Sequence, residues 1–293
     1  MSALSTLALR GPFWVDARLH RLSLWTGVAL LALAAAALPA ARWYVDGLGA
    51  DLTASGCKVE KIVPGCGIPV RHYLSVSLYF NRLFFLTSWL LTVLPVLLGA
   101  FVAGPVVGRE LESGTYRLQW TQSVTPGRWL AGKLLLPAAG ALLVLPASVL
   151  VQGWALSTTL HSWYPVEWYQ NTVYPTVGPV AVAYALFAIA VGALAGLLLR
   201  RTVAGMAAAV GATAGTIIAL ALLRPHLWPT ADSAASSAHP WDLSTATASG
   251  VTDVRYHPEA HFWPLQLVEG GIVLILAAAA TGAAFAVLRR RHA

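Results

Sequence analysis

Long stretches of apolar residues alternate with short polar segments along the chain. Five stretches without any charged residue cover positions 22–41, 84–104, 134–159, 179–199 and 202–223. A sixth covers 265–288 and holds one acid, Glu269. Each has at least the roughly 20 residues that a helix needs to cross a hydrocarbon layer about 30 Å thick. They are continuously apolar instead of alternating, which favours helices over barrel strands. The pattern predicts an all-α polytopic membrane protein with six transmembrane helices.

Composition and charge support this class and suggest an orientation. Only 11% of residues are charged, whereas soluble domains carry about 25%, so an ordinary soluble protein is excluded. Lys and Arg are densest before 22–41, in 105–133, in 200–201 and in 289–291. Basic residues concentrate on the cytoplasmic side of membrane proteins. Both termini are therefore expected in the cytoplasm, with 42–83 and 224–264 as extracellular loops. We attribute the net positive charge of the chain to this topology, and no nucleic-acid partner is expected.

The two cysteines, Cys57 and Cys66, both lie in the expected extracellular segment 42–83. An even number of cysteines on the oxidising side of a membrane predicts a disulfide. A metal site is the rival interpretation, but two thiols without nearby histidines supply at most half of a ligand set. We therefore expect a disulfide and no metal.

The stretch GRWLAGKL, residues 127–134, resembles the phosphate-binding loop Gly-x-x-x-x-Gly-Lys-[Ser/Thr]. It ends in Leu134, which lacks the hydroxyl that would hold magnesium, and it contains the bulky Trp129. The stretch is better interpreted as a helix start, with Thr125 as N-cap and Pro126 in the first position. Lys133 would then extend to the lipid headgroups. This chain is expected to bind no nucleotide.

Other enzyme chemistry is equally weak in this sequence. His257, Glu259 and His261 form HPEAH, which is not the His-Glu-x-x-His order of zinc proteases and has no evident third ligand. Glu269 is the one ionisable residue inside a predicted span, near its outer end, where an interfacial role is expected. We therefore expect no enzyme activity, and a separate subunit should supply the driving force.

The segment 105–130, between the second and third predicted spans, is the one sizeable cytoplasmic connection. It combines charged residues with the large aromatics Tyr116, Trp120 and Trp129, a mixture suited to a membrane interface or a protein contact. Helix is expected to continue from the second span, to end at Ser113-Gly114, and to be followed by a short second helical turn.

The run LPVLLGAFVAGPVVGRELESGTYRLQWTQSVTPGRWLAGKL resembles permease subunits of type 2 ATP-binding-cassette (ABC) exporters, especially their actinobacterial branch. A second run, YHPEAHFWPLQLVEGG, resembles the lead into their last span. The resemblance implies that about 109–122 holds the coupling helix, which fits into a cleft of the ATPase subunit. The matching residues and their neighbours are Arg109, Glu110, Glu112, Gly114, Thr115, Arg117 and Gln119. It also implies an interfacial helix over 11–21, with Trp14, Arg18 and Arg21.

The same resemblance implies a permease subunit in a bacterial plasma membrane, paired with a second permease as a homodimer or heterodimer and contacting lipid. ATP and Mg would be bound by the partner ATPase, and no cofactor by this chain. An apolar path favours a lipophilic or amphipathic substrate, such as a drug, antibiotic or lipid. Relatives also close their exit with re-entrant helices, for which only 262–267 is apt here, the polar middle of 224–264 being expected as a flexible loop.

Two further points stay open in the sequence. The spacings Gly192 to Gly196 and Gly211 to Gly215 permit close helix contact, within one subunit or between two. A membrane anchor or sensor without transport activity is the alternative function.

Overall fold

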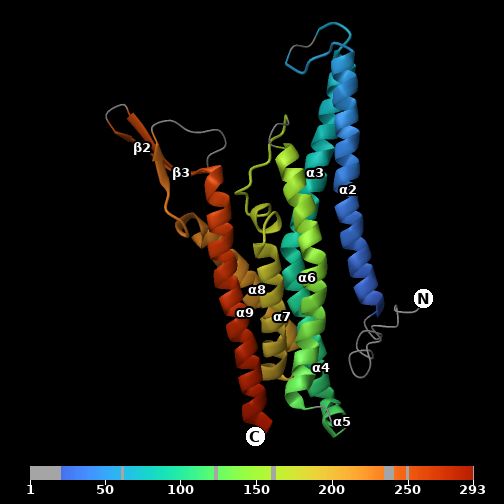
Figure 1. The fold of residues 1–293 in the computed structure, drawn as a ribbon, viewed down its shortest axis with the longest axis vertical. Coiled ribbons are helices and arrows are strands. Elements are labelled where there is room, and N and C mark those ends of the chain that lie inside the picture. The colour runs from blue at the N-terminus through green and yellow to red at the C-terminus, as the bar shows by residue number, and fades with distance from the viewer. Residues whose placement is uncertain are drawn as a thin grey trace, which may run out of the picture.

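Long, roughly aligned helices make up most of the molecule (Figure 1). The computed structural model describes residues 21–60, 63–121, 125–159, 163–233, 241–248 and 251–292. The predicted interfacial helix 11–21 lies outside this part, apart from the backbone of Arg21. The long helices are α2 (Arg21–Ala54), α3 (Gly67–Leu97), α6 (Pro126–Thr159), α7 (Val180–Leu199), α8 (Thr202–Leu223) and α9 (Phe262–His292). Shorter ones are the π-helix η1 (Leu98–Ala103), α4 (Gly104–Ser113), α5 (Tyr116–Thr121), η2 (Tyr174–Thr176), η3 (Arg224–His226) and η4 (Glu259–His261).

Five helical segments of the described chain are long and apolar enough to cross a membrane. They are Gly67–Ser113, Pro126–Thr159, Val180–Leu199, Thr202–His226 and Glu259–Arg290. The remaining predicted span, 22–41, is helical as part of α2 but is not among these five. Five candidate spans indicate a multi-pass membrane protein, while the sixth span and the orientation of the termini stay predictions.

The prediction of a loop over 42–83 is wrong, because helix occupies most of it. α2 continues to Ala54 and α3 already begins at Gly67, so that the two form a long hairpin (Figure 1). Charged residues ended the predicted span at 41, but they continue the helix: Arg42 pairs with Asp46 one turn later, at 2.7 Å. The charged residues therefore end the apolar stretch, but they do not end the helix.

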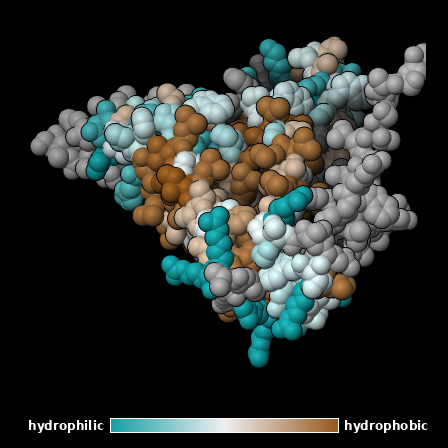
Figure 2. All heavy atoms as spheres, turned by 60° about the horizontal axis from the view of Figure 1, so that its bottom comes forward, coloured by the Kyte–Doolittle hydropathy of each residue, from teal (hydrophilic) through white to brown (hydrophobic). Residues whose placement is uncertain are grey.

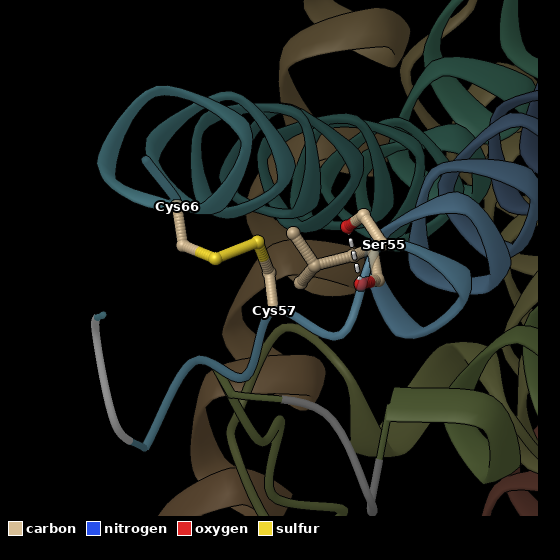
Figure 3. The surroundings of a disulfide bond; sticks show 4 residues. Ser55, Cys57 and Cys66 are labelled. Carbon is tan, nitrogen blue, oxygen red and sulfur yellow. Dashed lines mark hydrogen bonds between the residues drawn. A yellow bond between two sulfur atoms is a disulfide. The ribbon is translucent and has the colours of Figure 1, made fainter. Parts of the chain in front are cut away.

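The predicted disulfide closes the tip of this hairpin. Cys57 and Cys66 are bonded, with their Cα atoms 5.5 Å apart (Figure 3). Both are buried with Leu52 of α2 and Val70 of α3. The bridge therefore fixes how the two helices meet at this end of the molecule.

Helix α7 lies at the centre of the bundle and is the most buried of the five candidate spans. It packs against α9, α8 and α6, and closely against η1 and α4. Small residues permit that approach: a β-carbon on Gly192 would lie 2.5 Å from the carbonyl oxygen of Gly99. Gly196 is similarly close to the backbone of Gly104. The Gly192 to Gly196 spacing is thus used within the subunit, whereas β-carbons on Gly211 and Gly215 would meet open space.

The all-α prediction needs correction between α8 and α9. Strands β1 (Ala231–Ser233), β2 (Trp241–Ala248) and β3 (Val251–His257) form an antiparallel sheet in the order β1-β3-β2, where a flexible loop was expected. The alternation in DVRYH suits a strand, and Trp241 pairs opposite His257. The expected re-entrant segment 262–267 is instead the start of the continuous helix α9.

Candidate functional site

The segment that connects α3 and α6 forms a tight elbow at the end of the bundle that also holds the C terminus (Figure 1). α4 ends at Ser113, and Gly114 adopts a left-handed conformation with φ of 73°, which glycine reaches without steric cost. The short helix α5 then begins at Tyr116. Both the helix end at Ser113-Gly114 and the second helical turn are confirmed.

Aromatic side chains hold α5 against the bundle. Tyr116 and Trp120 lie one turn apart, and their ring centroids are 4.7 Å from each other. Trp120 also meets Trp129 of α6 edge-on, at 6.0 Å. These rings pack on a buried cluster that includes Val107 and Leu130. The inner face of α5 is therefore anchored to α4 and α6.

Glu110 is the central polar contact of the elbow. Its carboxylate accepts a hydrogen bond from Nε1 of Trp129 at 2.7 Å and pairs with Nζ of Lys133 at 2.6 Å. The Lys133 side chain is only 4% exposed, so the expectation that it extends to the headgroups is wrong. A carboxylate within reach compensates the ammonium group better than partial hydration at the membrane edge.

Glu112, beyond the predicted span, connects the elbow to a different helix. It accepts hydrogen bonds from both the backbone N–H and the hydroxyl of Thr202, at 2.8 and 2.6 Å. Thr202 is the first residue of α8, and Arg201 before it provides no side-chain cap. Glu112 thus caps α8 from a distance. Glu110 and Glu112 together connect the elbow to α6 and α8.

The outer face of the elbow is exposed. The exposed residues of the elbow are Arg109, Glu112, Ser113, Thr115, Arg117, Leu118 and Thr121. Leu118 stands out as an apolar side chain that is 65% exposed. The hydroxyls of Thr115 and Ser113 are 3.0 Å apart, and Arg117 donates to the Tyr116 hydroxyl at 3.4 Å. Gln119 lies in α5, but its side chain is outside the described part.

Hydrophilic residues surround this end of the molecule. Figure 2, which brings the end with α5 and the C terminus forward, shows a continuous hydrophobic region bordered by hydrophilic side chains. The exposed face of α5 combines a cation, a hydroxyl and one large apolar group. Such a mixture fits contact with another protein.

The stretch GRWLAGKL, which resembles a phosphate loop, is helical throughout. It lies in the first turns of α6, which begins at Pro126, and the N–H of Arg128 donates to the Thr125 hydroxyl at 3.4 Å. The predicted helix start is confirmed. Its Trp129 and Lys133 bind Glu110 of the elbow, so they act in packing between α4 and α6.

A buried polar cluster lies at the opposite end of the bundle. Glu269, for which an interfacial role is predicted, is fully buried within the bundle. Its carboxylate accepts two hydrogen bonds from the guanidinium of Arg224, at 2.8 and 3.1 Å, and one from the Tyr184 hydroxyl at 2.7 Å. The Arg224 guanidinium also lies 3.8 Å from the centre of the Tyr174 ring. The cluster joins α7, α9, η2 and η3.

His257 and His261 do meet, without a third metal ligand. Their Nδ1 atoms are 3.0 Å apart, and Nε2 of His257 lies 3.1 Å from the carbonyl oxygen of Pro225. Because that carbonyl can only accept, His257 donates to it from Nε2, and with a neutral His257 ring the contact between the two Nδ1 atoms is donated by His261. Across the described ranges, no three His, Cys, Asp or Glu side chains are grouped to hold a metal ion.

Sequence reasoning missed the inward contacts of the elbow. Glu110 and Glu112 were expected to face a partner, but both bind within the chain, and neither Thr202 nor Lys133 was expected to contact them. One signal was available: Lys133 and Trp129 lie one helical turn apart and so share a face of α6. Nothing in the sequence indicated that Arg224 would reach Glu269.

Comparison with family models matches residues 28–224 to the family described as "ABC-2 membrane transporter related". The match covers most of the chain and includes the whole elbow, the start of α6 and the capped end of α8. Searches against curated proteins and against solved structures gave no match.

Proposed function

Because the chain belongs to the ABC-2 membrane transporter related family, we propose that it is the permease subunit of an ATP-driven exporter. Permeases of this family are transmembrane subunits that work with an ATPase partner. The proposed role of this chain is to carry a lipophilic or amphipathic compound outward across a bacterial plasma membrane. ATP and Mg would be bound and used by the partner, not by this chain.

The observation that carries the proposal is the exposed outer face of the α4–α5 elbow. Arg117, Leu118 and Thr121 offer charge, apolar area and hydroxyl on one short helix whose inner face is packed against the bundle. A short helix whose inner face is already packed against the bundle suits insertion into a cleft of another protein, because it loses little conformational entropy on binding. We propose that the ATPase contacts this face.

The two glutamates would then transmit movement instead of touching the ATPase. Glu110 links the elbow to α6 through Trp129 and Lys133, and Glu112 links it to the first residue of α8. A displacement of α5 would reach both helices through short, charge-assisted hydrogen bonds. In this scheme, closure of the ATPases tilts α6 and α8 and opens the path outward.

A second permease is part of the proposal, as a homodimer or heterodimer. The outer face of α8 supports it: Val203, Ile218 and Leu222 are exposed, and Gly211 and Gly215 have open space beside them. Small residues flanked by apolar ones permit close helix contact in lipid.

The experiment is co-expression with the cassette ATPase encoded beside this chain, gentle solubilisation, copurification and measurement of ATP hydrolysis. Leu118→Glu places a charge in the proposed contact and is expected to reduce recovery of the ATPase at least about tenfold, since burying an unpaired charge is costly. Ile68→Glu is the matched control. Ile68 is 75% exposed but lies beside the disulfide at the far end.

Equal assembly of the Leu118→Glu variant and the wild type would place the ATPase contact elsewhere. Failure of the wild type to bind any cassette ATPase would overturn the exporter proposal. The alternative function, a membrane anchor or sensor without transport activity, would then be favoured.

A further inference from the structure

A groove of about 910 Å³ opens between α6, α7 and the beginning of α9. It lies in the half of the bundle next to the sheet, away from the α4–α5 elbow. Its floor includes the buried Trp168 and Val177, and Gly178 before α7. This size lies within the range of about 300 to 1,000 Å³ that holds drug-sized ligands. The groove can therefore admit one such molecule.

Indole rings are prominent in the walls of this groove. Trp154 of α6 and Trp263 of α9 line it and are 44% and 59% exposed, while Trp168 is almost fully buried. Exposed tryptophans near the ends of apolar helices are typical of the membrane interface. Indole faces also attract cations, more strongly than other aromatic rings do.

One charge lies among these apolar walls. Glu259 is the only ionisable side chain among the described residues that line the groove. It is exposed, and no hydrogen bond or ion pair of its carboxylate occurs within the described residues. Apart from the indole N–H groups, the other polar side chain that lines the groove is Ser157, near the end of α6. A lone carboxylate beside three indoles favours a positive head and repels an anion.

We propose that this groove binds a lipophilic monocation, with its apolar body between α6 and α9 and its positive centre near Glu259. Both parts of the lining are needed: the apolar walls provide affinity, and the carboxylate with the indoles determines the sign of the charge. The inference rests on the proposed function in that it names the charge of the compound this transporter would carry. Binding itself requires neither the ATPase nor ATP.

The test uses the purified full chain in detergent, without any ATPase, and radiolabelled tetraphenylphosphonium as the probe. Saturable binding to the wild type is expected. Tetraphenylborate, which has the same shape and the opposite charge, is expected not to compete. Glu259→Gln should weaken binding about fivefold, the upper range for an exposed ion pair. Trp263→Ala should weaken it at least about threefold.

Asp242→Asn is the matched control. Asp242 is an exposed carboxylate on β2, at the same end of the molecule but outside the groove lining, and its loss should leave affinity unchanged. Thermal unfolding of each variant confirms that the fold is kept.

Three results would overturn the proposal: equal binding of Glu259→Gln and wild type, equal competition by tetraphenylborate, or copurified phospholipid that neither probe displaces. The second would mean an apolar groove without charge selection, and the third a lipid site. Each differs from failure of the proposed function, which would show as lost ATPase copurification with cation binding intact.

Discussion

Lys133 is a buried ammonium group that pairs with the carboxylate of Glu110 at 2.6 Å. Removing one member of a buried pair leaves the other charge desolvated, at a cost that reaches about 3 to 5 kcal/mol. The amide oxygen of Gln can still accept a hydrogen bond from Lys133, which reduces that cost. We therefore expect Glu110→Gln to lower the free energy of unfolding by about 2 kcal/mol.

Thermal unfolding in detergent measures this effect, and a double variant isolates its cause. Glu110→Gln with Lys133→Met removes both charges and should recover most of the lost stability. A double variant as unstable as the single one would show that the ion pair is not the source. Either way, Leu118→Glu should leave unfolding unchanged, because its side chain already faces solvent.

Residue identities in these sites could be predicted only in part. Glu110, Glu112 and Glu269 attract attention because carboxylates are rare in this chain. Their partners could not be predicted, since Lys133, Thr202 and Arg224 are 23, 90 and 45 positions away. Long-range pairs depend on which helices become neighbours, and periodicity along one chain does not contain that information.

Helix α7 depends on glycine for its central place. Gly192 faces the backbone of Gly99 and Gly104, so an added methyl group would force α7 away from η1 and α4. Overpacking of this kind typically costs about 1 to 3 kcal/mol. We expect Gly192→Ala to lower the midpoint of thermal unfolding.

Gly140→Ala is the matched control for that variant. Gly140 lies inside α6 with open space where a β-carbon would be, so its replacement should be neutral or slightly stabilising. If both variants unfold alike, close approach of α7 to η1 is not what positions it.

The observed helix boundaries agree with the predicted ones where charged residues lie at the point at which the chain reverses direction. α7 and α8 begin and end within a residue of the predicted spans, because Arg200 and Arg201 separate them. α2 ends well after its predicted span and α3 begins well before its own, because a helix can continue through charged residues that interrupt the apolar pattern. The sheet was missed because only β3 shows a clear alternation among small polar residues.

At the scale of the whole molecule, the disulfide and the elbow lie at opposite ends of the bundle (Figure 1). The predicted orientation places the first outside the cell and the second inside. In a background without cysteines (Cys57→Ser, Cys66→Ser), we expect Glu60→Cys to react with a membrane-impermeant maleimide on intact cells. Thr115→Cys should react only after permeabilisation. Labelling in the reverse order would invert the topology.

The centre of the molecule was not predictable from the apolar stretches. All the predicted spans are similarly hydrophobic, so nothing in composition marks α7 as the one surrounded by the others. Small residues offered a hint, but Gly192 to Gly196 and Gly211 to Gly215 share the same spacing. Only the first pair lies in a tight contact.

The inward hydrogen bonds of Glu110 and Glu112 determine how this permease can be re-engineered to accept another ATPase. A segment grafted in place of 105–121 must itself present carboxylates at positions 110 and 112, because the donors that bind them, Trp129, Lys133 and Thr202, lie outside the graft. The transplantable unit is larger and discontinuous: it also includes the start of α6, with Trp129 and Lys133, and the first residue of α8. Chimeras that exchange all three pieces together should fold, whereas an elbow that lacks either carboxylate would lose its hydrogen bonds to α6 or α8.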